Sequence, residues 1–188
     1  MRTNSASLEQ FDDRIEREKE IYEKCIDKQF VNFFTDNETG GGVFIHLLVN
    51  KEAGDYKDVL NVALAFAKLG KDVKILPIIA DRETLKYRQK IFTNYPPQLL
   101  KNPDIRIDEF YLDIKRPLEI KNITKNANSA SSQGAIAVIS DCNLNNKMNA
   151  DILNKRALAI FNNENRENYL FNELYFFTEK KLIKYNRD

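Results

Sequence analysis

Asp104, Asp113 and Lys115 stand within two short alternating runs in the segment KNPDIRIDEFYLDIKRP, residues 101–117. Two short runs of alternating apolar and polar residues in this segment predict a β-hairpin with a two-residue turn between them. Because successive side chains of a strand point to opposite faces, Asp104 is expected on one face of the hairpin, together with Asp113 and Lys115. Antiparallel pairing then places Asp104 opposite Asp113 and diagonal to Lys115.

Neighbouring carboxylates repel each other when both are ionised, and a hard divalent cation relieves this repulsion. The pair Asp104 and Asp113 could therefore hold such a cation, and Lys115 could position a water or stabilise the charge of a phosphate. The same spacing also fits a solvated hairpin face on which Asp, Arg and Lys neutralise one another in weak pairs. Spacing alone favours this second interpretation, so the surrounding elements have to decide.

The elements around the hairpin predict an α/β (α+β) fold. Apolar and β-branched runs predict strands, and helical spacing between an Asp cap and a glycine predicts a helix before the hairpin. The expected strands are 43–50, 72–79, the hairpin, 135–140 and 157–161, and the expected helices are 55–69, a polar segment ending at Gly134, 145–155 and an aromatic-rich helix 167–185. This pattern predicts a central mixed sheet of about four to five strands with a β-hairpin, flanked by helices.

The first part of the chain predicts a helical arm. Apolar residues recur at helical spacing between residues 8 and 34, which is typical of one amphipathic helix. Glycines at 40–42 follow, where regular structure is expected to stop. We therefore expect an N-terminal helical extension, residues 1–39, and an α/β domain, residues 40–188. Within that domain, residues 81–102 are expected to form a long excursion or lid, because adjacent prolines block a regular element there.

Composition excludes several classes of protein. The 188 residues include 29 basic and 28 acidic ones, a net charge of +1, so any basic site must be local. The two cysteines, Cys25 and Cys142, lie far apart and lack the spacing of a zinc site. No stretch approaches the roughly 20 apolar residues of a membrane span. We expect a protein of the cytoplasm, or one delivered to a target cytoplasm by a larger system, with no membrane partner and an oligomeric state that the sequence leaves open.

The hairpin motif resembles the signature of the PD-(D/E)XK nuclease superfamily. Pro103 and Asp104 are followed nine residues later by Asp113 and then Lys115, and the expected order of elements is similar to the common core of that superfamily. The resemblance implies that the two aspartates bind Mg²⁺ or Mn²⁺ and that Lys115 aligns the attacking water. It also implies hydrolysis of a phosphodiester. We expect RNA as the substrate before DNA, and the sequence leaves that choice open.

Further residues enter through the same resemblance. Gln133, before the buried strand 135–140, resembles the glutamine that some of these nucleases carry there. A helix acid, Glu52 or Asp55, would complete the metal shell. Basic residues near the acidic pair could bind substrate phosphates, although charge runs also serve only solubility; these residues are Arg106, Arg116, Lys121 and Lys125.

A wider resemblance covers residues 41–140. Blocks in this range follow the same order as in toxin-type nuclease domains at the C-termini of phage head proteins and contact-dependent inhibition effectors, some of them assigned to barnase, EndoU, colicin and RelE-like RNases. It implies a possible cognate inhibitor of the immunity type. It also implies an alternative chemistry, metal-independent RNA cleavage by 2′-hydroxyl attack, with His46 as acid or base and Lys115 and a residue of 122–132 stabilising the transition state.

Two less specific alternatives stay open. A single histidine within FIHLLV is more often a satisfied residue of a half-buried strand than a catalyst. The whole chain could also be a degenerate nuclease fold that serves as a binding or assembly module without catalysis.

Overall fold

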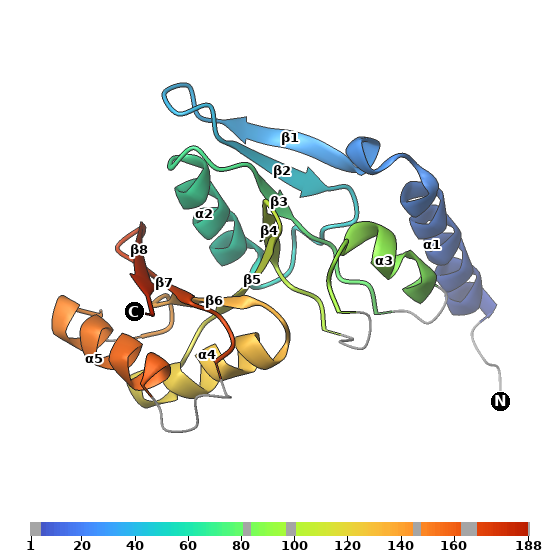
Figure 1. The fold of residues 1–188 in the computed structure, drawn as a ribbon. Coiled ribbons are helices and arrows are strands. Elements are labelled where there is room, and N and C mark those ends of the chain that lie inside the picture. Colours follow the sequence, from blue (N-terminus) through green and yellow to red (C-terminus); the bar gives the residue numbers. More distant parts are fainter. Residues whose placement is uncertain (1–4, 81–83, 97–100, 145–147, 163–168, 188) are drawn as a thin grey trace.

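The computed structural model describes residues 5–80, 84–96, 101–144, 148–162 and 169–187, and side chains from residue 12 onward (Figure 1). The described chain forms a mixed sheet of eight strands that lie side by side in chain order. The strands are β1 (Phe30–Thr35), β2 (Gly42–His46), β3 (Val73–Ile75), β4 (Ile105–Ile107), β5 (Phe110–Lys115), β6 (Ile136–Ser140), β7 (Glu173–Thr178) and β8 (Lys181–Asn186). The α-helices are α1 (Ser5–Glu23), α2 (Tyr56–Ala67), α3 (Arg88–Ile91), α4 (Ile123–Ser132) and α5 (Ala150–Phe161), with 3₁₀ turns η1 (Ile26–Gln29), η2 (Leu85–Tyr87) and η3 (Ile120–Asn122).

Strand direction follows the type of connection. The pairs β2–β3, β5–β6 and β6–β7 are parallel, and α2, α4 and α5 lie in the corresponding connections. The remaining neighbours pair antiparallel. This confirms the predicted α+β class with a mixed sheet and a hairpin. The sheet has more strands than predicted, because segments expected to be helical are strands.

Helices cover both faces of the sheet (Figure 1). On one face, α2 packs against alternate residues of the central strands, which include Ile105, Leu112 and Val138. On the other face, α4 and α5 pack against Ala137 and Ile139, the neighbours of Val138 in β6. Because α2 and α4 cover opposite faces, the alternation of β5 and β6 puts one set of side chains under each helix. A third cluster, around Tyr22, Phe92 and Tyr111, joins α1 and α3 to the sheet.

The hairpin has the predicted geometry. Ile105 pairs with Leu112 and Ile107 with Phe110, and Asp108 takes a positive φ of 52° in the turn. The isoleucines of β4 are buried against α2. The alternation of polar and apolar residues was therefore sufficient to determine which face each hairpin side chain occupies.

The N-terminal segment differs from the prediction. The expected single helix over residues 8–34 ends at Glu23, and residues 30–35 form β1, which pairs antiparallel with β2. The glycines at 40–42 form the tight connection between these strands: Gly40 has a φ of 77°, and a Cβ on Gly41 would overlap the carbonyl oxygen of Ala67. Close packing against the end of α2, rather than a loose linker, explains why glycine is required here.

The C-terminal segment was also predicted wrongly as a helix, because pairing with a neighbouring strand overrides its local pattern. Instead of the predicted helix 167–185, the described residues from 169 onward contain β7 and β8, joined by Glu179 and Lys180 with φ values of 50° and 62°. The apolar positions there fit a helical stripe, but pairing with β6 selects the extended form. The predicted strand 157–161 is instead the last part of α5. The predicted excursion holds η2 and α3, and its residues 81–83 and 97–100 lie outside the described part of the chain. In the described residues, no helix is long and apolar enough to cross a membrane.

Candidate active site

A polar pocket of about 440 Å³ opens where β5 ends, beside the start of α2. It is lined by Asp55, Val59, Asp104, Asp113, Ile114, Lys115, Arg116 and Asn143. Three of these residues are the predicted acidic pair and its lysine. The hairpin therefore directs all three into one concave site, rather than spreading them over an open surface.

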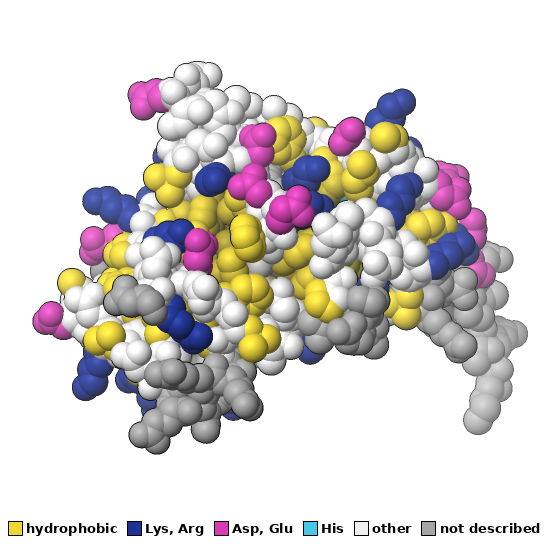
Figure 2. Space-filling view, in the orientation of Figure 1, with side chains coloured by type: hydrophobic (Ala, Val, Ile, Leu, Met, Phe, Trp, Pro, Cys, Tyr) yellow, Lys and Arg dark blue, Asp and Glu magenta, His cyan; other side chains and the backbone are white. Residues whose placement is uncertain are grey.

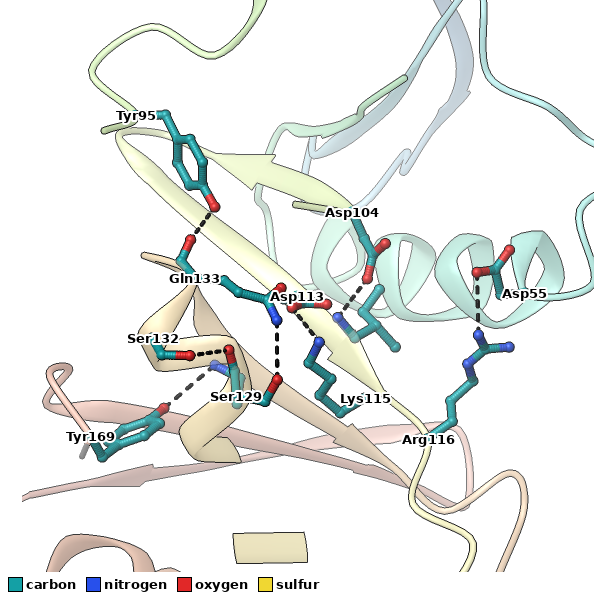
Figure 3. Close-up of polar contacts among 12 residues, drawn as sticks. Asp55, Tyr95, Asp104, Asp113, Lys115, Arg116, Ser129, Ser132, Gln133 and Tyr169 are labelled. Carbon is teal, nitrogen blue, oxygen red and sulfur yellow. Dashed lines mark hydrogen bonds and ion pairs between the residues drawn. The ribbon is translucent and has the colours of Figure 1, made fainter. Parts of the chain in front are cut away.

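Asp113 and Lys115 form a close ion pair in this pocket. The Lys115 Nζ lies 2.6 Å from Asp113 Oδ2 (Figure 3). The Asp113 side chain is 9% exposed and that of Lys115 is 19% exposed. They alternate with Leu112 and Ile114, which are buried under α2, so they stand on the α4 face of β5. At this burial the attraction between the charges is screened less than it is in water.

Asp104 lies beside this pair, just before β4. Its Oδ2 accepts a hydrogen bond of 2.6 Å from the amide of Ile114. Burial, together with repulsion from the Asp113 carboxylate, raises the pKa of Asp104 to about 7. A carboxylate in this position gains stability from a proton or from a cation, which is the electrostatic condition expected of a metal ligand.

The donor set fits Mg²⁺ or Mn²⁺ held partly by other ligands. Two carboxylates line the pocket together, and Mg²⁺ is commonly bound by one or two carboxylates, with waters and substrate phosphate filling the other positions. Within the described residues, no group of three or more His, Cys, Asp or Glu side chains is arranged to hold an ion.

The two predicted helix acids differ in position. Asp55 also lines the pocket, but its Oδ2 lies 3.2 Å from Arg116 Nη2. Glu52 is exposed in the loop before α2 and does not line the pocket; its backbone amide donates to Asn50 Oδ1. Of the two, Asp55 alone lines the pocket.

Gln133 lies at the end of α4. Its Nε2 donates to Ser129 Oγ at 3.0 Å, and its carbonyl oxygen accepts a hydrogen bond from the Tyr95 hydroxyl (Figure 3). Its side chain is on the same side of β5 as Asp113 and Lys115 in Figure 3, although it does not line the pocket. Gln133 thus lies beside the Asp113–Lys115 ion pair, and its side-chain amide is hydrogen-bonded to Ser129 of α4.

Of the four predicted substrate-binding residues, Arg116 alone lines the pocket. Arg106 lies over the Tyr111 ring and donates to the carbonyl of Asp108 at the hairpin turn. Lys121 pairs with Glu119 at 2.6 Å, and Lys125 is exposed on α4. Figure 2 shows basic and acidic side chains interspersed on the face that it presents. Attraction of a polyanion would therefore be local to Arg116 and Lys115.

His46 is buried away from the pocket, at the end of β2. It is 1% exposed, its Nδ1 accepts from the amide of Leu48, and its Nε2 lies 3.0 Å from Gln29 Oε1. Burial lowers the pKa of His46 to about 4. The structure therefore does not bring His46 together with Lys115, and both ring nitrogens have partners within the fold.

This environment predicts a pH effect on stability. Because the folded-state pKa of His46 is below its ordinary value of 6.5, the unfolded chain binds more protons between pH 4 and 6.5, and stability is lost as pH falls through that window. We expect this group to remove about 3 kcal/mol between pH 7 and pH 4. Urea unfolding of His46→Gln should show lower stability than wild type at pH 7, and the difference should shrink towards pH 4. A difference that is constant with pH would contradict the assignment.

Asn143 was missed by the sequence prediction. It follows β6, and its Nδ2 donates to the Arg116 carbonyl at 3.4 Å. Since β5 and β6 are parallel, their carboxyl ends meet at one edge of the sheet, so polar residues just after the buried strand 135–140 could have been assigned to the site. Tyr95 carried no such signal, because its contact with Gln133 depends on the path of the excursion.

Comparisons with known proteins found only a distant structural similarity. No protein-family model matches the chain, and no curated protein matches its sequence. Among solved structures, the CdiA-CT/CdiI toxin and immunity complex from Burkholderia pseudomallei contains a similar chain, with a TM-score of 0.46 and 18% sequence identity over 74% of this chain and 90% of that one. At this level of similarity the likeness supports no conclusion about function.

Proposed function

We propose that the protein is a metal-dependent nuclease that hydrolyses phosphodiester bonds. The observation that carries this proposal is the convergence of Asp104, Asp113 and Lys115 in one pocket, with the Lys115 amine 2.6 Å from Asp113. A buried carboxylate beside a half-buried one with a raised pKa is costly for the fold, and a site of this kind is more often functional than structural. The motif shared with PD-(D/E)XK nucleases agrees with this assignment.

Each residue has a distinct role in the proposed reaction. Asp104 and Asp113 would hold Mg²⁺ or Mn²⁺, and such an ion would supply polarisation of the phosphate and a lower pKa for a water. Lys115, held by Asp113, orients the attacking water and stabilises the negative charge that develops on the phosphate. Arg116 at the mouth of the same pocket binds phosphate oxygens through its guanidinium.

RNA is the first substrate to test, with DNA beside it. A cognate inhibitor protein and delivery into a target cell are expectations of the sequence resemblance and accompany this proposal. His46 is not assigned a role in the reaction, because its ring nitrogens are already bonded to Gln29 and Leu48.

Metal dependence gives the direct test. End-labelled RNA and DNA oligonucleotides, single-stranded and duplex, are incubated with the purified chain in Mg²⁺, in Mn²⁺ or in EDTA. We expect cleavage with either cation, none in EDTA, and recovery when the cation is restored in excess. Cleavage that persists in EDTA and leaves 2′,3′-cyclic phosphate ends would show metal-independent transesterification instead. Absence of cleavage in every condition, with nucleic acid still bound, would favour a non-catalytic binding module.

A further inference from the structure

A second ion pair crosses the candidate active site. Arg116 follows Lys115 directly at the end of β5, and its guanidinium reaches the start of α2, where Nη2 lies 3.2 Å from Asp55 Oδ2 (Figure 3). Its Nη1 lies 3.6 Å from Asp58 Oδ2. Asp55 and Arg116 both line the pocket that contains Asp104 and Asp113. The third acid of the pocket is thus engaged by an arginine in the free protein.

This pair can exchange readily. The side chain of Asp55 is 45% exposed and that of Arg116 is 30% exposed. Ion pairs at such exposure contribute little to stability, because water and salt screen them. A guanidinium binds a phosphate through two parallel hydrogen bonds, so a phosphodiester in the pocket would compete well with a single carboxylate oxygen for Arg116.

Two contacts would keep Arg116 in place during such an exchange. Asp58 lies one helical turn after Asp55 and forms a second, longer contact with the guanidinium. The Asn143 side chain donates to the Arg116 carbonyl and ties its backbone to the loop after β6. Arg116 could therefore turn from Asp55 towards a ligand while its backbone stays fixed.

We infer that Arg116 is a phosphate-operated latch on the metal site. Without substrate it holds Asp55; when a phosphodiester enters the pocket, the guanidinium moves to the phosphate, and Asp55 becomes available to the metal beside Asp104 and Asp113. This inference rests on the proposed function and adds regulation to it. Metal and phosphodiester then bind cooperatively, because each stabilises the same arrangement of Arg116 and Asp55.

Metal affinity in the absence of nucleic acid tests the latch. Isothermal titration calorimetry with Mn²⁺ is performed on the full chain as wild type, Arg116→Met, Asp55→Asn and the double variant. We expect Arg116→Met to bind Mn²⁺ about fivefold more tightly than wild type, the lower end of typical coupling between sites. The gain should vanish when Asp55 is also replaced.

A matched variant separates the latch from general electrostatics. Lys121→Met removes one positive charge that is paired with Glu119 on an exposed surface after β5. Its effect on Mn²⁺ affinity should stay below about twofold, since exposed charges are screened by salt. A gain in Arg116→Met that persists in the double variant would show that the lost charge, and not the release of Asp55, explains it, and would overturn the latch.

The phosphodiester arm uses dimethyl phosphate, a small monoanion with the linkage of the proposed substrate. It should tighten Mn²⁺ binding by wild type and have no such effect on Arg116→Met; equal tightening in both would overturn the latch. If Mn²⁺ binding by wild type is abolished in Asp113→Asn but unchanged in Arg116→Met, the latch fails and the metal site stands. If wild type shows no Mn²⁺ binding that depends on Asp113, the metal site of the proposed function fails, and the latch with it.

Discussion

Asp113→Asn should reduce phosphodiester hydrolysis on the order of 1,000-fold, because it removes a buried negative charge from the pocket while keeping nearly the same shape. The change also leaves Lys115 without its 2.6 Å partner, so the amine that orients the water loses its anchor. Lys115→Met should cause a loss of similar size, because it removes the amine that orients the water and leaves Asp113 in place. The fold should survive in Asp113→Asn, since the repulsion between Asp113 and Asp104 disappears with the charge.

Initial rates of oligonucleotide cleavage at fixed Mg²⁺ measure this effect, and circular dichroism melting checks the fold. Asp108→Asn is the matched control: it removes an exposed carboxylate from the same hairpin, at the turn, where it pairs with Lys71 at 3.3 Å. Its rate should stay within about twofold of wild type, as expected for an exposed pair outside the pocket. An Asp113→Asn variant as active as Asp108→Asn would remove Asp113 from the proposed reaction.

Asp104→Asn should make the metal-free protein more stable at alkaline pH. Burial and the Asp113 charge raise the folded-state pKa of Asp104 to about 7, above its ordinary value of 3.8. The folded state therefore binds more protons than the unfolded state between these values, and stability falls as pH rises through the same window. Asparagine cannot ionise, so between pH 4 and pH 8 the variant should gain about 4 kcal/mol relative to wild type.

Urea unfolding in EDTA at several pH values measures this difference, and repeating it with Mn²⁺ adds a second readout. Mn²⁺ should stabilise wild type at pH 8, because an ion that binds only the folded state raises its stability, and should stabilise Asp104→Asn much less. His46 contributes a slope of opposite sign, so each group is isolated only by comparing its own variant with wild type. If the free energies of unfolding of wild type and Asp104→Asn change with pH in parallel, the ionised Asp104 carboxylate does not destabilise the folded state as predicted.

Local sequence was sufficient where neighbours in space are also neighbours in the chain. The hairpin joins strands separated by two residues, so the alternation from Ile105 to Lys115 determined the register and the meeting of Asp104 with Asp113. The burial of Tyr111 and Asp113 on the second face of β5 did not follow from that alternation. The same holds for α2, whose apolar spacing and following Gly70 are local signals. In these segments the spacing of apolar residues is compatible with only one type of secondary structure.

Segments whose sequence fits either a helix or a strand take the form that their neighbouring strands select. Residues 169–185 carry apolar side chains that fit a helical stripe, yet β7 exists because β6 and β8 pair with it. Residues 30–35 were continuous with a helical pattern and became β1 because β2 lies beside them. Strand propensity depends on what the strand packs and pairs with, so a single segment does not contain that information.

The chemistry of the site divides in the same way. The residue types of the site, two carboxylates beside a lysine, could be read from the hairpin, but by themselves they fitted a solvated face at least as well; the resemblance to a nuclease signature was what predicted a cation and a phosphate as ligands. The pairing of Asp55 with Arg116 and the bonding of both His46 nitrogens required the tertiary structure. The shifted pKa values of Asp104 and His46 also depend on it, because burial and charged neighbours come from elements distant in the chain, and a pKa is a property of that environment rather than of the residue type.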